Sequence, residues 1–404
     1  MQLLSIKIGK IFSQLKNIGF LGTVKKVFFA LRLTIFSIEF GDILFITNGT
    51  GDSARYRNWN MAEEFALHGF KCAVTIQDNL WLLKNAKKFK VFIFHRVIYN
   101  PKIAKLIAEI KKTGGEIIFS VDDLTFDPQY MIKTDSYENL NTLEKRQYAG
   151  GLGLEILQDP YVKTCVTATT YLAGILEKRG KKVFVIPNKL SNEDLELAEK
   201  IVCKQKIENL FIGKHNLIRI GYFSGSKSHN RDFATITESL LIIMEKFPKV
   251  RLILAGPLKT ESRLNKFKNR IKQLPYTARE KHFKNIAAVD INIVPLEIDD
   301  PYCESKSELK FFEAGILKVP TVAAATQTFR KAISEGVDGF LAKNTGEWIE
   351  KLEKLITSEN LRKQIGEKAR EKALLKYSNK NDCHEEFYGY LENILAKQES
   401  GSQP

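Results

Sequence analysis

Short apolar runs alternate with longer amphipathic segments along most of the chain. Apolar runs of about four to eight residues, bounded by turn-forming residues, are typical of strands that are buried on both faces. Because these runs alternate with segments of helical periodicity, the pattern predicts right-handed crossovers and parallel sheets. The first series of predicted strands comprises residues 41–48, 72–77, 91–96, 116–123, 161–169 and 183–187, and a second series runs from residue 218 to about residue 357 with strands at 289–297 and 319–325.

The two series predict two α/β domains, each with a doubly wound parallel sheet. A chain of 404 residues is too long for one ordinary hydrophobic core and suits two domains. Residues 191–216 are rich in Lys, Glu and Asn and are predicted to be helix plus linker. We therefore divide the chain into an N-terminal extension (1–40), an N-terminal domain (41–200), a C-terminal domain (201–375) and a C-terminal helix with a short tail (376–404).

The composition is that of an ordinary globular protein. Hydrophobic residues make up 44% of the chain and charged residues 27%. The five cysteines are far apart and form no Cys-x-x-Cys pair, which argues against a disulfide framework and against a structural zinc site. We therefore expect the protein to work in a reducing compartment, the cytoplasm.

The formal net charge of +15 predicts a partner that carries negative charge. The positive residues are dispersed along the chain, and no recognised nucleic-acid-binding module is present, so nucleic acid is not an expected partner. Anionic lipid and a phosphorylated substrate remain as candidate partners.

The first forty residues combine cations with large apolar residues. Basic amphipathic helices of this kind can lie in a lipid interface, where each cation contributes about 1 kcal/mol. The longest apolar run is interrupted by Arg32 and is too short to span a bilayer. We predict that residues 1–38 attach the protein peripherally to the anionic inner face of the cell membrane; the alternative is a helix that packs on the protein body. The cations are Lys7, Lys10, Lys16, Lys25, Lys26 and Arg32.

The segment 303–320 carries the most informative charges. Helical spacing would place Lys306, Lys310 and Glu313 close to one face, just after the carboxyl end of the predicted strand 289–297. In parallel sheets this edge is where ligands bind. Cations there suit a diphosphate, and a carboxylate accepts hydrogen bonds from ribose hydroxyls. The alternative is a solvated helix with an ordinary Lys-Glu pair.

Several segments in this order resemble the retaining glycosyltransferases of family 4, the glycosyl transferases group 1 type, which have the GT-B fold. They are residues 218–233 (IRIGYFSGSKSHNRDF), 250–256 (VRLILAG), 289–295 (VDINIVP), 303–320 and 335–342 (EGVDGFLA), with looser matches at 48–57, 120–124 and 183–188. The resemblance implies two Rossmann-like domains that face each other across a cleft, and a last helix that returns to the first domain. It also implies a nucleotide diphosphate sugar as co-substrate, no cofactor, and a glycan or lipid-linked acceptor, in the synthesis of cell-surface polysaccharide.

The resemblance assigns the donor to the C-terminal half. Arg231 and Lys310 are expected to stabilise the leaving diphosphate, and Glu313 matches the second carboxylate of the family's paired-glutamate motif. The first carboxylate falls on Ser305, with Glu304 adjacent, so the loop around these residues has to hold the donor sugar. The remaining donor-binding candidates are Gly225, Ser226, Lys227, Lys306 and Ser307.

The N-terminal half supplies the acceptor side of the expected cleft. Asp122 and Asp123 end one predicted strand, and His95 and Arg96 end another, so all four point to the same sheet edge. A carboxylate there orients or deprotonates an acceptor hydroxyl, and a neutral histidine steadies the donor sugar. The glycine turn with Gly49 and Gly51, together with Arg57, is the candidate acceptor-binding site; helix capping and strand-end packing are the structural alternatives.

No metal is expected, because the chain has no Asp-x-Asp triplet and fixed cations can stabilise the leaving group instead. Two other functions fit the same sequence. A GT-B-like sugar-nucleotide epimerase would use the same nucleotide site without an acceptor. A noncatalytic protein that binds polyanions or membranes would use mainly the net positive charge.

Overall fold

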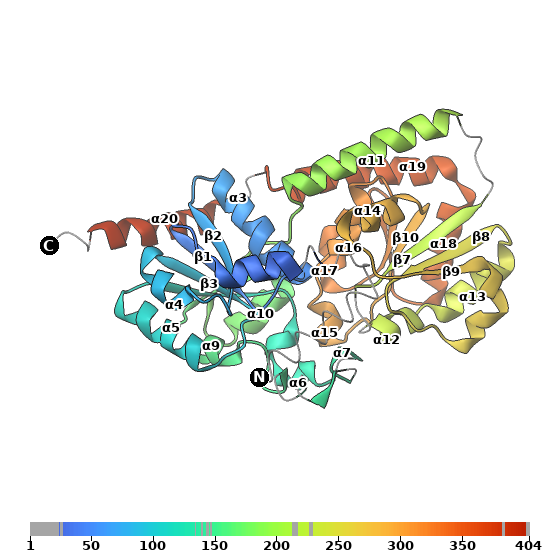
Figure 1. The fold of residues 1–404 in the computed structure, drawn as a ribbon. Coiled ribbons are helices and arrows are strands. Elements are labelled where there is room, and N and C mark those ends of the chain that lie inside the picture. Colours follow the sequence, from blue (N-terminus) through green and yellow to red (C-terminus); the bar gives the residue numbers. More distant parts are fainter. Residues whose placement is uncertain are drawn as a thin grey trace.

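The protein consists of two α/β domains that lie side by side (Figure 1). A computed structural model describes residue 24 and residues 27–133, 135–138, 140–142, 145, 148–211, 217–225, 229–381 and 384–400. Each domain has a six-stranded sheet with helices on both faces. The predicted architecture of two doubly wound parallel sheets is confirmed.

The N-terminal sheet has the strand order β2-β1-β3-β4-β5-β6, and its strand pairs are parallel. All six strands were predicted from the sequence. The order reverses between β1 and β3, and the carboxyl ends at such a switch point border a crevice. The strands are β1 (Ile43–Thr47), β2 (Cys72–Ile76), β3 (Val91–His95), β4 (Glu116–Val121), β5 (Thr164–Thr167) and β6 (Lys182–Val185).

The helices of this domain begin and end where local sequence signals place them. In α5, the Asn100 side chain accepts hydrogen bonds from the first backbone amides, Pro101 occupies the first turn, and one apolar face is buried. The helices are α2 (Asp52–Ala54), the π-helical η1 (Arg55–Asn60), α3 (Met61–Leu67), α4 (Leu82–Asn85), η2 (Ala86–Lys88), α5 (Pro101–Lys112), η3 (Leu124–Phe126), α6 (Pro128–Met131), α7 (Asp135–Glu138), α9 (Leu154–Gln158) and α10 (Thr170–Glu177).

The C-terminal sheet has the order β12-β11-β10-β7-β8-β9 and is also parallel. Its edge strand β9 was not predicted, because its four residues, IKQL, are only half apolar and lie at the sheet margin. The strands are β7 (Ile218–Phe223), β8 (Val250–Ala255), β9 (Ile271–Leu274), β10 (Ile291–Val294), β11 (Thr321–Ala324) and β12 (Phe340–Ala342).

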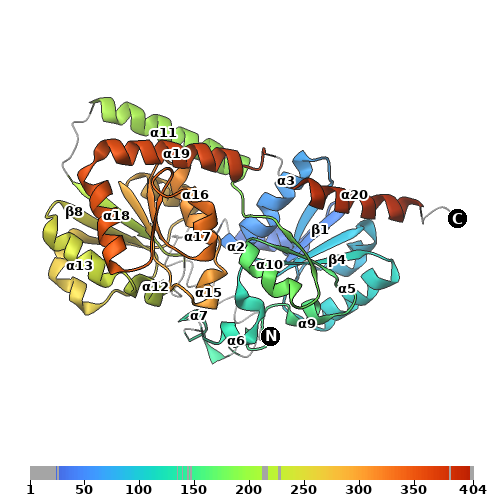
Figure 2. The same ribbon diagram turned by 180° about the vertical axis from the view of Figure 1, so that it is seen from behind.

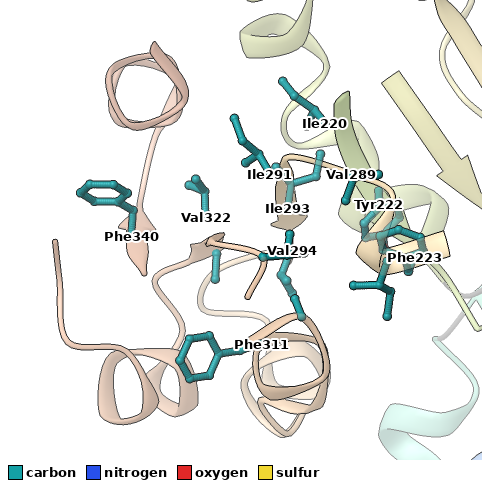
Figure 3. Packing of buried hydrophobic residues seen from close by; sticks show 14 of the residues in the cluster. Ile220, Tyr222, Phe223, Val289, Ile291, Ile293, Val294, Phe311, Val322 and Phe340 are labelled. Carbon is teal, nitrogen blue, oxygen red and sulfur yellow. The ribbon is translucent and has the colours of Figure 1, made fainter. Parts of the chain in front are cut away.

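The core of the C-terminal domain forms between this sheet and its helices (Figure 3). Ile220, Ile293 and Val322 on the strands are fully buried, and Phe311 packs beneath them from a helix. Burying side chains of this size contributes about 1.5–3 kcal/mol each. The helices are α12 (Asn230–Ala234), α13 (Thr237–Lys246), η5 (Ser262–Arg270), α14 (Arg279–Ala287), α15 (Pro301–Glu304), α16 (Leu309–Gly315), α17 (Gln327–Ala332), α18 (Thr345–Thr357) and α19 (Glu359–Lys376).

The helix between the sheets, α11 (Asn192–Phe211), corrects the predicted domain boundary at residue 200. It runs beside α19 in both views, and Arg370 of α19 bonds Glu199 (Figures 1 and 2). Ala198 and Ile201 belong to the core of the C-terminal domain. Through Ala198 and Ile201, α11 therefore packs on the C-terminal domain on both sides of the predicted boundary.

The last helix, α20 (Glu385–Ser400), returns to the N-terminal domain (Figure 2). Phe387 and Leu391 are buried in one cluster with Ile43 and Phe45 of β1. This is the return that the family resemblance implied.

The described part of the N-terminal extension packs on the first domain. Residues 27–35 are helical, and Asn79 donates its amide hydrogens to the carbonyls of Leu33 and Phe36 at 2.6 and 2.9 Å. Within the described residues, the structure contains no helix with the length and hydropathy needed to cross a membrane. Most of the predicted amphipathic segment, residues 1–23, 25 and 26, lies outside the described residues.

The segment 303–320 does not form the single helix that we predicted at its start. Asp300 caps α15, and the Ser305 hydroxyl donates to the Tyr302 carbonyl where that helix ends. The chain then leaves helical geometry until α16 begins at Leu309. Serine competes for backbone hydrogen bonds in this way and favours helix ends. Lys306 therefore lies in a loop rather than on a helix.

Candidate functional site

A cavity of about 190 Å³ lies where the carboxyl ends of the two sheets face each other. Each domain contributes charged or polar side chains to its wall. The lining residues are Asp52, Ser53, Tyr56, Asp122, Asp123, Asn188, His229, Val294, Leu296, Lys306, Ser307, Leu309, Lys310 and Phe329.

A cluster of hydrogen-bonded polar groups forms the N-terminal wall. The Ser53 hydroxyl donates to Asp122 Oδ2 at 2.6 Å and lies 3.3 Å from His95 Nε2. His95 Nε2 is also 3.2 Å from Asp122 Oδ1. The parallel register of β1, β3 and β4 ends these strands at one edge, so the structure brings His95 and Asp122 together as predicted.

Arg96 holds both predicted carboxylates at this wall. Its Nε donates to Asp122 at 2.9 Å, and a terminal nitrogen contacts Asp123 at 2.5 Å. Arg96 adopts a φ of 51°, an unusual backbone conformation for a non-glycine residue. Burial alone would raise the pKa of Asp122, but the Arg96 guanidinium holds this pKa well below its usual range. Asp122 is therefore an anion that accepts hydrogen bonds.

His95 is buried and neutral at physiological pH. Burial lowers its pKa, although Asp122 opposes the shift. The Asn58 amide nitrogen lies 3.0 Å from Nδ1 and can only donate, so Nδ1 accepts and the ring proton sits on Nε2. His95 thus presents an N–H to Asp122 and Ser53 behind the cavity wall.

Two lysines form the opposite, C-terminal wall. Lys306 Nζ lies 4.1 Å from the centroid of the Tyr302 ring. Burial would lower the pKa of Lys306, but Tyr302 and Asp123 raise it above its usual value. Burial, and next the positive charge of Lys306, lower the pKa of Lys310 to about 8. The cavity therefore has an acidic wall and a basic wall.

His229 and Asp232 lie beside the lysines. His229 Nδ1 is 2.7 Å from Asp232 Oδ2, and burial followed by Lys310 lowers the pKa of His229 to about 4. The other Asp232 oxygen accepts from the Cys303 thiol at 3.1 Å. Burial raises the pKa of that thiol, so Cys303 stays protonated and is unsuited to act as a nucleophile.

Asn188 joins the two walls. Its amide nitrogen donates to the Ser307 hydroxyl at 3.0 Å across the domain junction. Among the described residues its Oδ1 has no hydrogen-bond partner, although Asn188 is buried. A buried acceptor of this kind is costly unless a ligand or water bonds it, so Oδ1 can accept a hydrogen bond from a bound hydroxyl.

Glu313 lies in a buried polar network beside the cavity, outside its lining. Its carboxylate accepts from Tyr56 at 2.6 Å, contacts Arg279, and lies 3.3 Å from His282. Arg279 also donates to Asp194 at 2.8 Å. Burial would raise the pKa of Glu313, but Arg279 holds it far below its usual range. The expected contact of Glu313 with a ribose stays a prediction. In the structure, the carboxylate contacts Tyr56, Arg279 and His282 instead.

Glu304 and Ser305, the predicted substitutes for the first family carboxylate, both face the protein interior. Glu304 accepts from the backbone amides of Asp299 and Gln327, at 3.3 and 2.6 Å. Ser305 is fully buried. We therefore correct the assignment: these two side chains hold the loop and the start of α17 in place, whereas their neighbours Lys306 and Ser307 line the cavity.

The predicted donor loop after β7 is only partly described. Ser226 and Lys227 lie outside the described residues, and Gly225 is exposed in open space. Arg231, predicted to meet the diphosphate, is 60% exposed and bonds Glu297 at 2.9 Å. Lys306 and Lys310, rather than Arg231, line the cavity in this conformation.

Arg57 is the clearest correction on the acceptor side. The side chain is fully buried and donates to the Ile186 carbonyl at 2.6 Å and to the Ser120 hydroxyl. It fixes the ends of β4 and β6 and does not reach the cavity. The turn with Gly49 and Gly51 leads to the cavity, but the lining residues that follow it are Asp52 and Ser53.

Sequence reasoning missed several residues that the structure places at the site. Neither Ser53 nor Asn188 was predicted from the sequence to be a site residue. Tyr56 and Arg279 lie 223 positions apart and meet at Glu313 across the two domains. For Arg279 the local sequence carries no signal, because its partners become neighbours only on folding.

The match of the C-terminal domain to a known family identifies the activity. Residues 219–372 match the family described as Glycosyl transferases group 1. The protein is a glycosyltransferase. The matched residues include both lysines of the basic wall and Glu313, so the group 1 domain supplies the C-terminal half of the cavity.

Solved glycosyltransferase structures share the arrangement of both domains. HepE of Anabaena, in a complex with UDP-glucose, is 14% identical with a TM-score of 0.56, over 89% of this chain and 100% of HepE. Sucrose-phosphate synthase of Thermosynechococcus elongatus is 11% identical with a TM-score of 0.56, over 90% and 100%. WaaG, a glycosyltransferase of lipopolysaccharide biosynthesis, is 14% identical with a TM-score of 0.51, over 87% and 99%.

These similarities establish the fold, which is GT-B, as the sequence resemblance implied. No curated protein matches the chain in sequence.

Proposed function

We propose that this glycosyltransferase moves a sugar from a nucleotide diphosphate sugar to a glycan or lipid-linked acceptor. We further propose that transfer retains the anomeric configuration and needs no metal ion. The enzyme would act in cell-surface polysaccharide synthesis, in the cytoplasm at the inner face of the membrane. No bound cofactor is required in this scheme, because the nucleotide sugar is itself a substrate.

The charge separation across the cavity is the observation that carries this proposal. Breaking the glycosidic bond leaves a diphosphate with growing negative charge while the anomeric carbon becomes positive. Lys306 and Lys310 are fixed where they can stabilise the diphosphate, so the protein itself can supply the charge that a metal ion would otherwise supply.

The acidic wall suits the sugar and acceptor side of the reaction. Asp122 is anionic and lines the cavity, and the unpartnered Asn188 Oδ1 also accepts hydrogen bonds. These acceptors can orient hydroxyl groups of the donor sugar and of the acceptor. Asp122 is the residue proposed to orient the attacking hydroxyl, and His95 holds Asp122 in position.

The cavity has to open before a complete donor can bind. Ligand sites typically enclose about 300–1,000 Å³, and the cavity encloses about 190 Å³. Tyr56 with Glu313, Asn188 with Ser307, and Asp52 with Tyr276 bond across the two domains and hold the cleft closed. Opening would break these bonds, and closure around the donor would exclude water that hydrolyses it.

The relatives guide the choice of donor. HepE is described in complexes with UDP and with UDP-glucose, and WaaG as an enzyme of lipopolysaccharide biosynthesis. We therefore propose uridine diphosphate sugars as the first donors to test, and a membrane-anchored saccharide as the acceptor class.

When a panel of nucleotide sugars is screened, only those that bind the protein should raise its melting temperature. A ligand at 100 times its dissociation constant adds about 2.7 kcal/mol to the stability of the folded state. We expect UDP and at least one UDP-sugar to stabilise the protein equally with and without EDTA. Stabilisation by heparin or other polyanions, but by no nucleotide sugar, would support the noncatalytic alternative instead.

Product analysis separates transfer from epimerisation. With the donor identified, proton NMR of the product should show a glycosidic bond of the same anomeric configuration as the donor. Conversion of the nucleotide sugar to an epimer without any acceptor would support the epimerase alternative.

Donor affinity is expected to fall as the pH rises through about 8. Burial and Lys306 lower the pKa of Lys310 to about 8, so below this pH the side chain is a cation, and above it the charge is lost. UDP titrations by calorimetry between pH 6.5 and 9.5 should show the decline. Lys310→Arg, which stays charged throughout, should abolish it. In Lys306→Met the decline should move to higher pH, because the neighbouring positive charge is gone.

A further inference from the structure

The helix of residues 27–35 turns an apolar face away from the protein. Val24, Phe28, Leu31 and Ile35 recur at helical spacing, and all four are largely exposed. The opposite face packs on the N-terminal domain. On this side, Phe29 packs against Trp59, with ring centroids 5.8 Å apart. An ordinary amphipathic helix on a globular protein has the reverse orientation, with its apolar face inward.

Two residues from a different part of the chain continue this apolar face. Leu80 and Trp81 follow β2 and are exposed. The Leu80 amide donates to the Thr34 carbonyl at 2.9 Å, and the Trp81 indole N–H donates to the Ile35 carbonyl at 2.6 Å. These bonds fix the loop against the end of the helix, so the surface is built by the fold.

Phe36 directly follows the helix and extends the same surface. It is exposed, whereas Ile38 is buried in the core of the N-terminal domain. We call Val24, Phe28, Leu31, Ile35, Phe36, Leu80 and Trp81 the composite apolar face. A soluble monomer rarely leaves so many large apolar side chains uncovered in one region.

Cations accompany the composite apolar face. Arg32 is exposed on the helix, and Lys84 Nζ lies 5.2 Å from the centroid of the Trp81 ring. Residues 1–38 contain six Lys and Arg residues and no Asp or Glu. Aromatic and aliphatic side chains next to cations match a bilayer interface with anionic headgroups.

We propose that the composite apolar face inserts into the headgroup region of an anionic lipid bilayer, with Leu80 and Trp81 entering alongside the helix. The insertion site is therefore discontinuous in sequence, and it includes residues beyond the N-terminal stretch that the sequence indicated. The inference rests on the proposed function, since an enzyme for lipid-linked acceptors works at a bilayer.

The position of the face suits delivery of a membrane-bound acceptor. Phe29 packs on Trp59 of η1, and the same π-helical segment carries Tyr56, which lines the cavity. Figure 1 shows the dark-blue helix lying across the N-terminal domain next to the domain junction. A bilayer at this face lies on the same side of the N-terminal domain as the segment that borders the cavity.

Binding of the full-length protein to vesicles tests the face. Phosphatidylcholine vesicles with and without phosphatidylglycerol are sedimented with wild type, Phe28→Ser and Leu80→Ser. Each variant should lower the partition coefficient on anionic vesicles about tenfold. This is the change expected when one large apolar side chain no longer enters the bilayer. Leu375→Ser is the matched control, because Leu375 lies on α19 with 69% exposure, the same as Phe28 and Leu80; it should bind as wild type does.

Tryptophan fluorescence provides an independent measurement. Trp81 is 40% exposed and Trp348 is buried. Trp59 is half-buried under the helix. Brominated acyl chains should therefore quench the emission of the wild-type protein on anionic vesicles, and most of this quenching should be lost in Trp81→Phe.

Three results would overturn the inference. The first is wild-type binding by both serine variants. The second is a concentration-dependent dimer that both variants abolish, which would assign the face to a second copy of the chain. The third is loss of binding only when residues 1–23 are deleted. None of these results depends on donor binding, which the thermal-shift panel measures. A result that contradicts membrane insertion can therefore be distinguished from one that contradicts the proposed function.

Discussion

Replacing Lys306 by methionine is expected to lower kcat for sugar transfer by about 100- to 1,000-fold, the usual effect of removing one group that stabilises developing charge. Methionine keeps most of the aliphatic stem, so the cavity wall stays filled. Lys306 lines the cavity, and its acidic neighbours raise its pKa, which keeps it charged over the working pH range. Initial rates with a saturating nucleotide sugar measure the effect.

The matched control for this substitution is Lys363→Met. Lys363 is an exposed lysine on α19 that pairs with Glu359 one helical turn away, so kcat should not change. If Lys306→Met transfers sugar at the wild-type rate while it still binds UDP, the basic wall is not the group that stabilises the departing diphosphate.

Replacing Glu313 by alanine is expected to destabilise the C-terminal domain by about 3–5 kcal/mol, because removing one partner leaves a buried charge uncompensated. Arg279 would keep only Asp194 as a charged partner, and Tyr56 would lose the acceptor for its hydroxyl. Urea unfolding followed by far-ultraviolet circular dichroism at pH 7 measures the loss.

The pH dependence of stability should change with this substitution. The folded-state pKa of Glu313 is depressed, so its contribution is present above the unfolded value of about 4.3 and is lost as the pH falls below it. Wild type should therefore lose stability on acidification more steeply than Glu313→Ala.

The control for Glu313 is Glu280→Ala on α14. Glu280 is fully exposed and pairs with Lys284 on the same helix as Arg279, so the unfolding midpoint should stay at the wild-type value. A similar midpoint for Glu313→Ala would show that the buried network contributes little. The carboxylate would then be available to a ribose, as the family resemblance implies.

The strands and their order of appearance could be predicted because burial leaves a direct trace in the sequence. A strand covered on both faces reads as a short apolar run, and the runs at β1, β3 and β10 are fully buried. The edge strand β9 is not such a run, since the two central residues of its four, Lys272 and Gln273, are polar and exposed. The helix α20 was predicted from its periodicity, whereas its return to the first domain was predicted from the family resemblance.

The site was predictable where one strand end decides a residue's position. His95 and Asp122 end neighbouring parallel strands, and the sheet register alone brings them to one edge. Arg57 was misassigned because a cation near a glycine turn resembles an anion site, whereas folding buries it against the ends of β4 and β6. The Ser305 hydroxyl bonds the Tyr302 carbonyl and ends the helix before Lys306. The periodicity of the sequence did not predict this helix end.

The sequence by itself determined two parallel α/β domains, the return of the last helix and a basic C-terminal half, because these follow from hydrophobic periodicity, family motifs and charge. Only the tertiary structure decided which charges face the cavity. Lys306 and Asp123 both border it, although they lie far apart in the chain and in different domains. Side-chain direction depends on contacts between distant segments, and linear spacing carries no information about those contacts.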